Sequence, residues 1–250
     1  MKPIALQLYT IREAAAQDFP AALKRVAEIG YKGVEPAGLH GHKPSEIAGI
    51  IRDLGLEVPS SHTDLPTPEN VQQIVETELA LGNKRIITSF WTEDFRTVDT
   101  CKQAAEKLNR AADLVKPYGL TLGIHNHWWE FQRVDGGYCY DILMEEAPGI
   151  FGQLDVYWTA YGKADPIEII RRYKSRLPLL HIKDGSLEED APHLAVGAGV
   201  LNMPAIIHAA DPNVLEWLIV ELDSYDGDAF DAVKQSYDYL VTNKLGVGTK

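Results

Sequence analysis

The chain has 250 residues, enough for one α/β barrel or two small domains. It carries 24 Lys and Arg against 36 Asp and Glu, a net charge of -12. This excess of acid argues against a nucleic-acid or membrane partner, because either needs basic patches. Cys101 and Cys139 show no zinc-type spacing, so we expect two reduced thiols. The N-terminus becomes polar too early for a signal peptide, and no apolar run approaches the roughly 20 residues that span a bilayer, so we expect a cytoplasmic protein.

Short apolar runs alternate with amphipathic segments along the whole chain. The predicted strands are Ile4–Leu8, Gly33–Glu35, Glu57–Ser61, Arg85–Thr88, Thr121–His125, Phe151–Asp155, Leu179–Ile182 and Leu215–Glu221. The predicted helices are Phe19–Ile29, Pro44–Leu54, Pro68–Leu81, Thr97–Lys116, Tyr138–Glu146, Asp165–Tyr173, Met203–Ala209 and Phe230–Asn243. Proline begins several of these helices and glycine follows several others, as expected at helix ends.

Eight strand–helix alternations without a long linker predict an α/β fold, a (β/α)8 TIM barrel that forms a single domain over residues 1–250. An open doubly wound sheet is the alternative, and it would be expected to carry a glycine-rich phosphate loop after its first strand. The residues that follow Leu8 read YTIREAAAQ and contain no glycine. The barrel is therefore favoured.

Four residues that can bind a metal lie at or just past the ends of predicted strands. They are Glu130, Asp155, His181 and Glu221. A barrel places its active site at the C-terminal ends of its strands, so we expect these side chains to converge. Carboxylate oxygens with one imidazole suit one divalent metal ion, with Mn²⁺ foremost and Mg²⁺, Co²⁺ or Zn²⁺ as other ions. Such a site predicts a metal-dependent enzyme that acts on a small sugar or polyol.

Other strand ends carry residues suited to binding a substrate. Lys183 could stabilise a developing enolate, and indole rings provide apolar walls for the C–H faces of a sugar. In the segment VGAGV, backbone N–H groups near Gly199 could meet a substrate oxygen. No basic cluster near the strand ends requires a phosphate, so an unphosphorylated sugar or glycoside is favoured. The predicted substrate-binding residues are Tyr9, Glu35, His62, Trp91, His125, Trp158 and Gly199.

Several segments together resemble the xylose isomerase-like TIM barrel superfamily, the sugar phosphate isomerase/epimerase-like family. They read IALQLYTIRE, GYKGVEPAG, LGIHNHWWEF, GQLDVYW, LLHIKD, VGAGVLNMPAII and VELD, and they extend over nearly the whole chain. The resemblance implies that Asp155, His181 and Glu221 bind one divalent metal. Many members carry a glutamate where this chain has His125, and a subgroup with an HNHxxEF pattern uses a later glutamate. We therefore predict Glu130 as the fourth ligand, with His125 or His127 as alternatives. Family members often form dimers or tetramers, which implies a homo-oligomer.

The resemblance implies an isomerase or epimerase of a sugar or keto-polyol. A proton next to a carbonyl is removed, an enediolate forms, and the proton is returned elsewhere. Glu130 and Glu221 would act as base and acid, with Lys183 and His127 stabilising the oxyanion. The alternative is a lyase, dehydratase or hydratase acting on 3-keto-sugars, keto-glycosides or keto-inositols, because elimination shares the first step.

Two further readings are weaker. A non-catalytic sugar-binding barrel is a minor alternative, kept because the strand-five position departs from the family pattern. An abasic-site nuclease of the same fold is disfavoured, since it needs three zinc ions and a basic groove, whereas this chain has 8 histidines and a net charge of -12.

Overall fold

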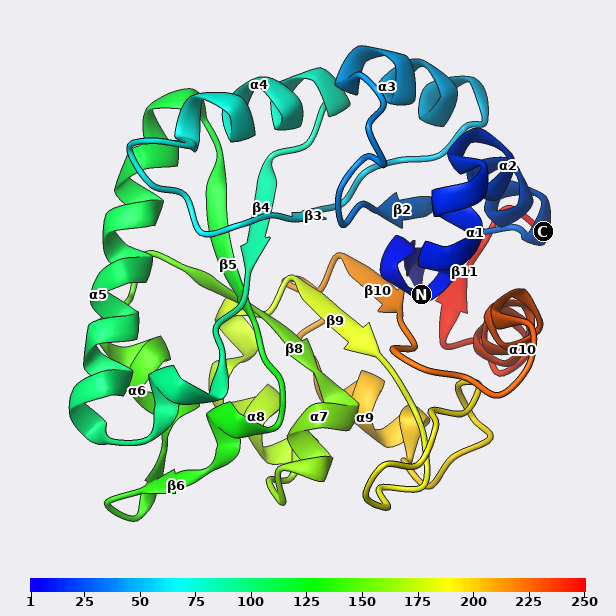
Figure 1. The fold of residues 1–250 in the computed structure, drawn as a ribbon. Helices are drawn as coiled ribbons and strands as arrows, with labels where there is room; N and C mark the ends of the chain where they lie inside the picture. The colour runs from blue at the N-terminus through cyan, green and yellow to red at the C-terminus, as the bar shows by residue number, and fades with distance from the viewer.

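The computed structural model describes residues 1–250 and contains eight parallel strands in a nearly closed ring (Figure 1). The strands of the ring are β1 (Lys2–Gln7), β2 (Gly33–Glu35), β3 (Ser61–His62), β4 (Arg85–Thr88), β5 (Thr121–His125), β8 (Phe151–Asp155), β9 (Leu179–Ile182) and β10 (Trp217–Val220). Isolated parallel bridges, Gly33 with Glu57 and Ala37 with His62, connect β2 to the chain around β3. The short strand β11 (Gly246–Val247) pairs with β1 outside the ring. The predicted single-domain TIM barrel is therefore confirmed as a fold.

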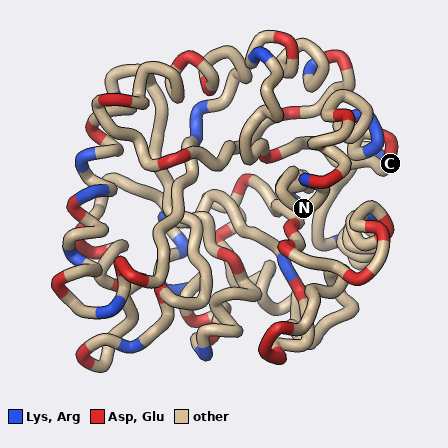
Figure 2. Tube along the Cα trace, in the orientation of Figure 1, with Lys and Arg blue, Asp and Glu red and all other residues tan.

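Helices surround the strands. They are α1 (Arg12–Gln17), α2 (Phe19–Ile29), α3 (Pro44–Asp53), α4 (Val71–Leu81), α5 (Val98–Val115), α6 (Cys139–Glu146), α7 (Val156–Tyr161), α8 (Pro166–Tyr173), α9 (Met203–Ala209) and α10 (Ala229–Thr242). Their ends follow local rules: the Asp18 carboxylate accepts the Ala21 N–H at the start of α2, and Gly30 ends that helix with a φ of 124°. Acidic and basic residues are interspersed on α5 and the other outer helices (Figure 2). No helix is long and apolar enough to cross a membrane.

Most predicted elements are present within one or two residues of their expected ends. The exception among the strands is Glu57–Ser61, which is reduced to Ser61–His62. Pro59 has no N–H to donate to a neighbouring strand, so the chain before it makes only the single bridge at Glu57. The short helices α1 and α7 and the hairpin of β6 (Arg133–Val134) and β7 (Gly137–Tyr138) were not predicted. All three lie in connections that follow barrel strands.

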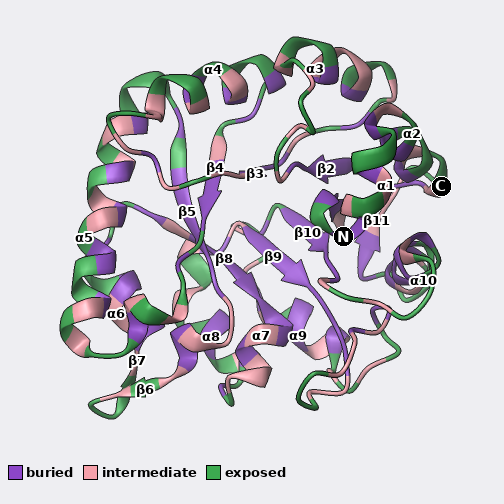
Figure 3. Cartoon of the chain, in the orientation of Figure 1, coloured by how far each residue is buried: buried purple, intermediate pink, exposed green.

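The core has two parts, one between strands and helices and one inside the ring (Figure 3). The inner part is a small apolar cluster of Ala5, Ile87, Leu179, Trp217 and Ile219. Side chains two residues apart on a strand point to the same face, so the residues two positions further along these strands also point inward. The apolar cluster thus forms the floor of a polar layer at the C-terminal ends of the strands.

Cys101 and Cys139 are joined by a disulfide between α5 and α6, with their Cα atoms 5.7 Å apart. The expectation of two reduced thiols is therefore wrong. The sequence could not reveal the pair, because the cysteines are 38 residues apart and meet only when the two helices pack together. The expectation of a cytoplasmic location rested partly on reduced thiols and loses that support.

Candidate metal centre and active site

The polar layer brings together four residues that can bind a metal. Ligand atoms of His125, Asp155, His181 and Glu221 all lie within 4.8 Å of one another, and all four residues are buried. They come from the ends of β5, β8 and β9 and from the residue after β10. Three of the four are the residues that the sequence predicted as ligands on β8, β9 and β10. Two imidazoles and two carboxylates form a donor set suited to a divalent transition metal.

The Asp155 carboxylate has one oxygen that could still bind a cation. One of its oxygens, Oδ1, accepts the N–H of Trp158 at 2.8 Å and begins helix α7. The other, Oδ2, is buried and meets none of the hydrogen-bond criteria, and its one positive neighbour is the Lys183 ammonium at 3.2 Å. Burial raises the pKa of Asp155 to about 6, and the nearby Glu221 carboxylate adds to this effect. A carboxylate has about four acceptor sites, and the contacts of Asp155 leave some of them free at Oδ2, so the residues present fit a cation.

Glu130, the predicted strand-five ligand, does not belong to this group of four. It lies in a 3-10 turn after β5, is wholly buried, and its Oε2 accepts the N–H of His127 at 2.8 Å. Burial raises the pKa of Glu130 to about 8, because few groups around it compensate its charge. His125 occupies the place in the group that was predicted for Glu130.

Lys183 is a wholly buried cation beside the group. Its Nζ lies 3.2 Å from Asp155 Oδ2, 2.9 Å from Glu221 Oε2 and 2.7 Å from Asp223 Oδ2. Burial alone would lower the pKa of Lys183, but the carboxylates around it, Asp155 first, outweigh burial and raise that pKa. The ammonium also lies 5.3 Å from the centre of the Trp158 ring. A fixed positive charge at this point can stabilise negative charge that develops on a substrate.

Glu35 lies deep in the barrel, behind His181. Both ring nitrogens of His181 face carboxylates, with Nε2 2.6 Å from Glu35 Oε2 and Nδ1 3.0 Å from Glu221 Oε2. Burial would lower the pKa of His181, yet the two carboxylates raise it to about 10. Gln153 connects this region to His62 and His125, since its Oε1 is 2.8 Å from His62 Nε2 and 3.2 Å from His125 Nδ1.

Aromatic rings line the rim of the polar layer. Trp91 is 73% exposed and lies over Trp129, with ring centroids 6.3 Å apart. His127 stacks on the Trp129 ring, with ring centroids 4.3 Å apart, and Trp158 donates its indole N–H to Asp223 at 3.1 Å. Tyr9, which follows β1, is 45% exposed. Of the three predicted aromatic substrate residues, Trp158 contacts Lys183 and Asp223 at the layer, and the substrate contacts of Trp91 and Tyr9 stay predictions.

The backbone N–H groups around Gly199 donate to the side chain of Asp184 rather than into the open site. The N–H groups of Gly197 and Gly199 donate to Asp184 Oδ2 at 3.0 and 3.2 Å, and the N–H of Leu201 donates to Asp184 Oδ1 at 3.2 Å. A Cβ at Gly199 would overlap the Asp184 carboxylate, which explains the glycine. This geometry favours a structural role for Gly199 over the expected contact with substrate.

Two site residues escaped the sequence analysis. Gln153 lies in the middle of β8, and Gln7 ends β1; both are fully buried. The available signal was their position, because Gln153 precedes Asp155 by two residues and so points to the same face. A polar side chain on the inward face of a barrel strand, next to a predicted ligand, indicates a hydrogen-bond partner for the site.

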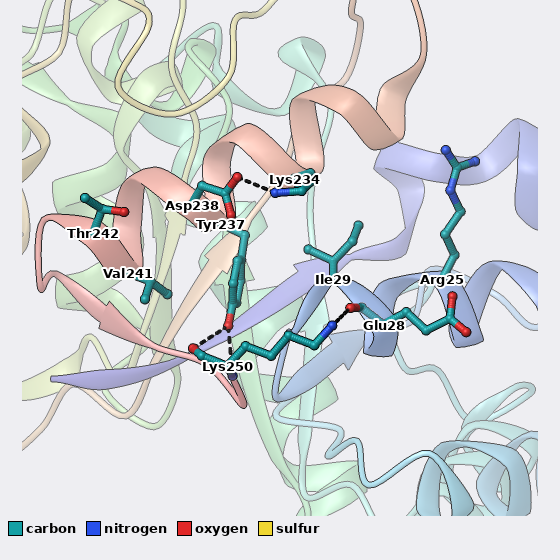
Figure 4. A pocket seen from close by; sticks show the side chains of 9 residues that line it. All are labelled: Arg25, Glu28, Ile29, Lys234, Tyr237, Asp238, Val241, Thr242 and Lys250. Carbon is teal, nitrogen blue, oxygen red and sulfur yellow. Dashed lines mark hydrogen bonds and ion pairs between the residues drawn. The ribbon is translucent and has the colours of Figure 1, made fainter.

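Clefts of about 450 and 480 Å³ lie beside the layer. The first is lined by Arg12 and Asp223 among others, and the second by His62 and Asp64 among others. A further hollow of about 440 Å³ lies between α2 and α10, where the Tyr237 hydroxyl donates to the backbone carbonyl of Lys250 (Figure 4). This hollow is at the N-terminal end of the barrel, away from the four candidate ligands, and it carries no comparable group.

Comparisons with known proteins agree with this architecture. A family model described as the xylose isomerase-like TIM barrel matches residues 23–242. A sugar phosphate isomerase/epimerase from Parabacteroides distasonis ATCC 8503 is 28% identical, with a TM-score of 0.77 over 96% of this chain and 93% of that chain. A second protein of that description from the same organism is 26% identical, with a TM-score of 0.80 over 96% of this chain and 98% of that chain.

A more distant structure shows the same fold. The probable 3-DHS dehydratase AsbF from Bacillus anthracis is 15% identical, with a TM-score of 0.76 over 98% of this chain and 100% of that chain. A comparison with curated protein sequences gave no match. The family match covers most of the chain and agrees with the observed barrel, so the protein belongs to the xylose isomerase-like TIM barrel family.

Proposed function

We propose that the protein is a divalent-metal-dependent isomerase or epimerase of a sugar or keto-polyol. The observation that carries the proposal is the buried group of His125, Asp155, His181 and Glu221, whose ligand atoms all lie within 4.8 Å of one another. These four residues would hold one ion. The mixed imidazole and carboxylate set suits Mn²⁺, Co²⁺ or Zn²⁺, and Mn²⁺ remains our first choice. The family and the two isomerase/epimerase relatives support this class of reaction.

The bound ion would act as a Lewis acid that polarises a substrate carbonyl and acidifies the adjacent C–H. Glu221 is the proposed base, since it is the least buried of the four grouped residues, at 5% exposed. Lys183, 2.9 Å from Glu221, would stabilise the oxyanion that forms when the proton leaves. Glu130 stays a prediction as the second acid, and a pKa of about 8 would keep it protonated near pH 7.

An unphosphorylated substrate is the finer part of the proposal. The cations near the layer are already engaged, because Lys183 pairs with carboxylates and Arg12 donates to the backbone carbonyls of Tyr9 and Asp223. The loop amides that could bind a phosphate donate to Asp184 instead. A neutral polyol is therefore favoured over a phosphate ester, with the exposed Trp91 available to a sugar ring.

A lyase or dehydratase acting on 3-keto-sugars, keto-glycosides or keto-inositols is the second candidate. It shares the proton removal by Glu221 and differs only in the loss of an oxygen from the next carbon. The buried ammonium of Lys183 suits this reaction too, since a fixed cation can stabilise a departing oxygen as well as an enolate.

The test begins with elemental analysis of the purified protein, of Asp155→Ala and of His181→Ala, before and after soaking in Mn²⁺. One ion per chain in the wild type, lost in both variants, supports the site. The loaded enzyme is then incubated with keto-sugars in D₂O, where incorporation of deuterium with a change of configuration indicates epimerisation and a new absorbing enone indicates elimination. A wild type that binds no metal would refute the proposal and favour a non-catalytic sugar-binding barrel.

A further inference from the structure

Glu35 is a buried carboxylate whose two oxygens are fully used. Oε2 accepts Gln7 Nε2 at 2.7 Å and His181 Nε2 at 2.6 Å, while Oε1 accepts Gln153 Nε2 at 2.5 Å and the Ser60 hydroxyl. A carboxylate offers about four acceptor sites, so these donors occupy them all. Glu35 has none left for a substrate, which favours a positioning role over the substrate contact expected from the sequence.

The contact with Glu35 decides which nitrogen of His181 is free. An ionised carboxylate only accepts hydrogen bonds, so the His181 nitrogen that faces it, Nε2, must carry a hydrogen. The other nitrogen, Nδ1, faces the Glu221 carboxylate at 3.0 Å and would carry a hydrogen while no ion is bound, but a cation held by Glu221 would take the place of that hydrogen. Nδ1 is therefore the atom that His181 can offer to a cation held with Glu221.

Gln153 connects Glu35 to His125 and so determines which nitrogen of His125 carries its hydrogen. Its amide nitrogen donates to Glu35, which fixes the orientation of the amide and turns Oε1 toward the imidazoles. Oε1 lies 3.2 Å from His125 Nδ1 and 2.8 Å from His62 Nε2. Because Oε1 is an acceptor, both of these nitrogens must be donors. His125 then carries its hydrogen on Nδ1 and can offer Nε2 to a cation.

We propose that Glu35 is a positioning residue that sets opposite tautomers in two metal-binding histidines, directly in His181 and through Gln153 in His125. The inference rests on the proposed metal site. Partners of this kind orient ligand imidazoles and fix which nitrogen binds. Two histidines that must offer different nitrogens to one ion need such a partner more than a single histidine does.

A rival arrangement uses the same atoms differently. His62, His125 and His181 also have nitrogen atoms within 4.8 Å of one another, so three imidazoles could hold a second ion. In that arrangement each imidazole would bind through one nitrogen, and a nitrogen that faces Gln153 or Glu35 would carry no hydrogen wherever it is the ligand. The number of bound ions and the positions of the ring hydrogens therefore distinguish the two arrangements.

The experiment uses the whole chain, labelled with ¹⁵N in its histidine rings and loaded with Zn²⁺ alone. Ring spectra should show the His181 hydrogen on Nε2 and the His125 hydrogen on Nδ1. Calorimetry should show that Glu35→Gln and Gln153→Met each lower Zn²⁺ affinity by about 10–100-fold. Glu78→Gln is the matched control, because Glu78 is another buried glutamate that accepts Ser61 and Asn83 but contacts no histidine; its affinity should stay unchanged.

Each outcome has a distinct meaning. Opposite ring hydrogens, one ion per chain and a loss of affinity in the two site variants support the inference. Two ions per chain, or the same tautomer in both rings, would overturn it while leaving the metal site intact. Equal affinity in Glu35→Gln and the wild type would also overturn it. A wild type without Zn²⁺ would refute the proposed function itself. The wild-type ring spectra need no variant, so they decide even where Glu35→Gln does not fold.

Discussion

Replacing Lys183 with methionine should destabilise the protein strongly. The ammonium lies within 3.2 Å of carboxylate oxygens of Asp155, Glu221 and Asp223, and two of these three residues are buried with it. Removing one partner of a buried ion pair costs about 3–5 kcal/mol, because the remaining charge is left uncompensated. Methionine is close to the lysine stem in volume, so little of this loss would come from a cavity.

The assay is thermal unfolding of chelator-treated protein. A loss of that size lowers the melting temperature by roughly 6–20 °C, since 1 kcal/mol corresponds to about 2–4 °C in a domain of this size. Added Mn²⁺ should stabilise Lys183→Met more than the wild type, because the ion supplies the missing positive charge. Lys234→Met is the control: its partner Asp238 is exposed, so the loss should stay below about 1 kcal/mol. Equal melting of Lys183→Met and the wild type would refute the reasoning.

Two shorter predictions concern Glu221 and Glu78. Glu221→Gln should lower turnover by about 10²–10⁴-fold with unchanged circular dichroism, the range for loss of a general base; full activity would contradict the proposed base. Burial raises the pKa of Glu78 in the folded protein, so protonation of this side chain favours folding. That contribution to stability is complete below the unfolded pKa of about 4.3 and is lost as pH rises through the raised folded pKa. The free energy of unfolding of Glu78→Gln, measured in urea, should therefore rise relative to that of the wild type between pH 4 and pH 8. A difference in free energy that stays constant with pH would count against this.

The sequence predicts the fold well where one signal dominates. Strands such as Arg85–Thr88 and Leu179–Ile182 begin and end where expected, because buried parallel strands are short apolar runs bounded by turn residues. The strand around Pro59 is displaced, since its pairing depends on which backbone N–H groups are available rather than on hydrophobicity. The disulfide between Cys101 and Cys139 depends on helix packing, which no local pattern reports.

The site is predictable in its ligand types and less so in its inner connections. Asp155, His181 and Glu221 could be found because each ends an apolar strand. The role of Gln153 could not, because hydrogen-bond partners depend on side-chain orientation inside the ring. The same limit applies to Glu35, which the sequence predicts as a substrate contact and whose four hydrogen-bond donors are visible only in the structure.

The choice between Glu130 and His125 can be settled by Glu130→Gln. At pH 7 a carboxyl with a pKa of about 8 is mostly neutral, and glutamine keeps an oxygen for the His127 N–H, so the substitution should change stability little. If His125 completes the group, Glu130→Gln should bind Mn²⁺ as tightly as the wild type in calorimetry. Asp155→Asn, which changes a member of the group, should bind it much more weakly. Equal losses in the two variants would instead make Glu130 a ligand, as the HNHxxEF pattern predicts, and the turn after β5 would then have to bring its carboxylate out from behind His127 when the ion binds.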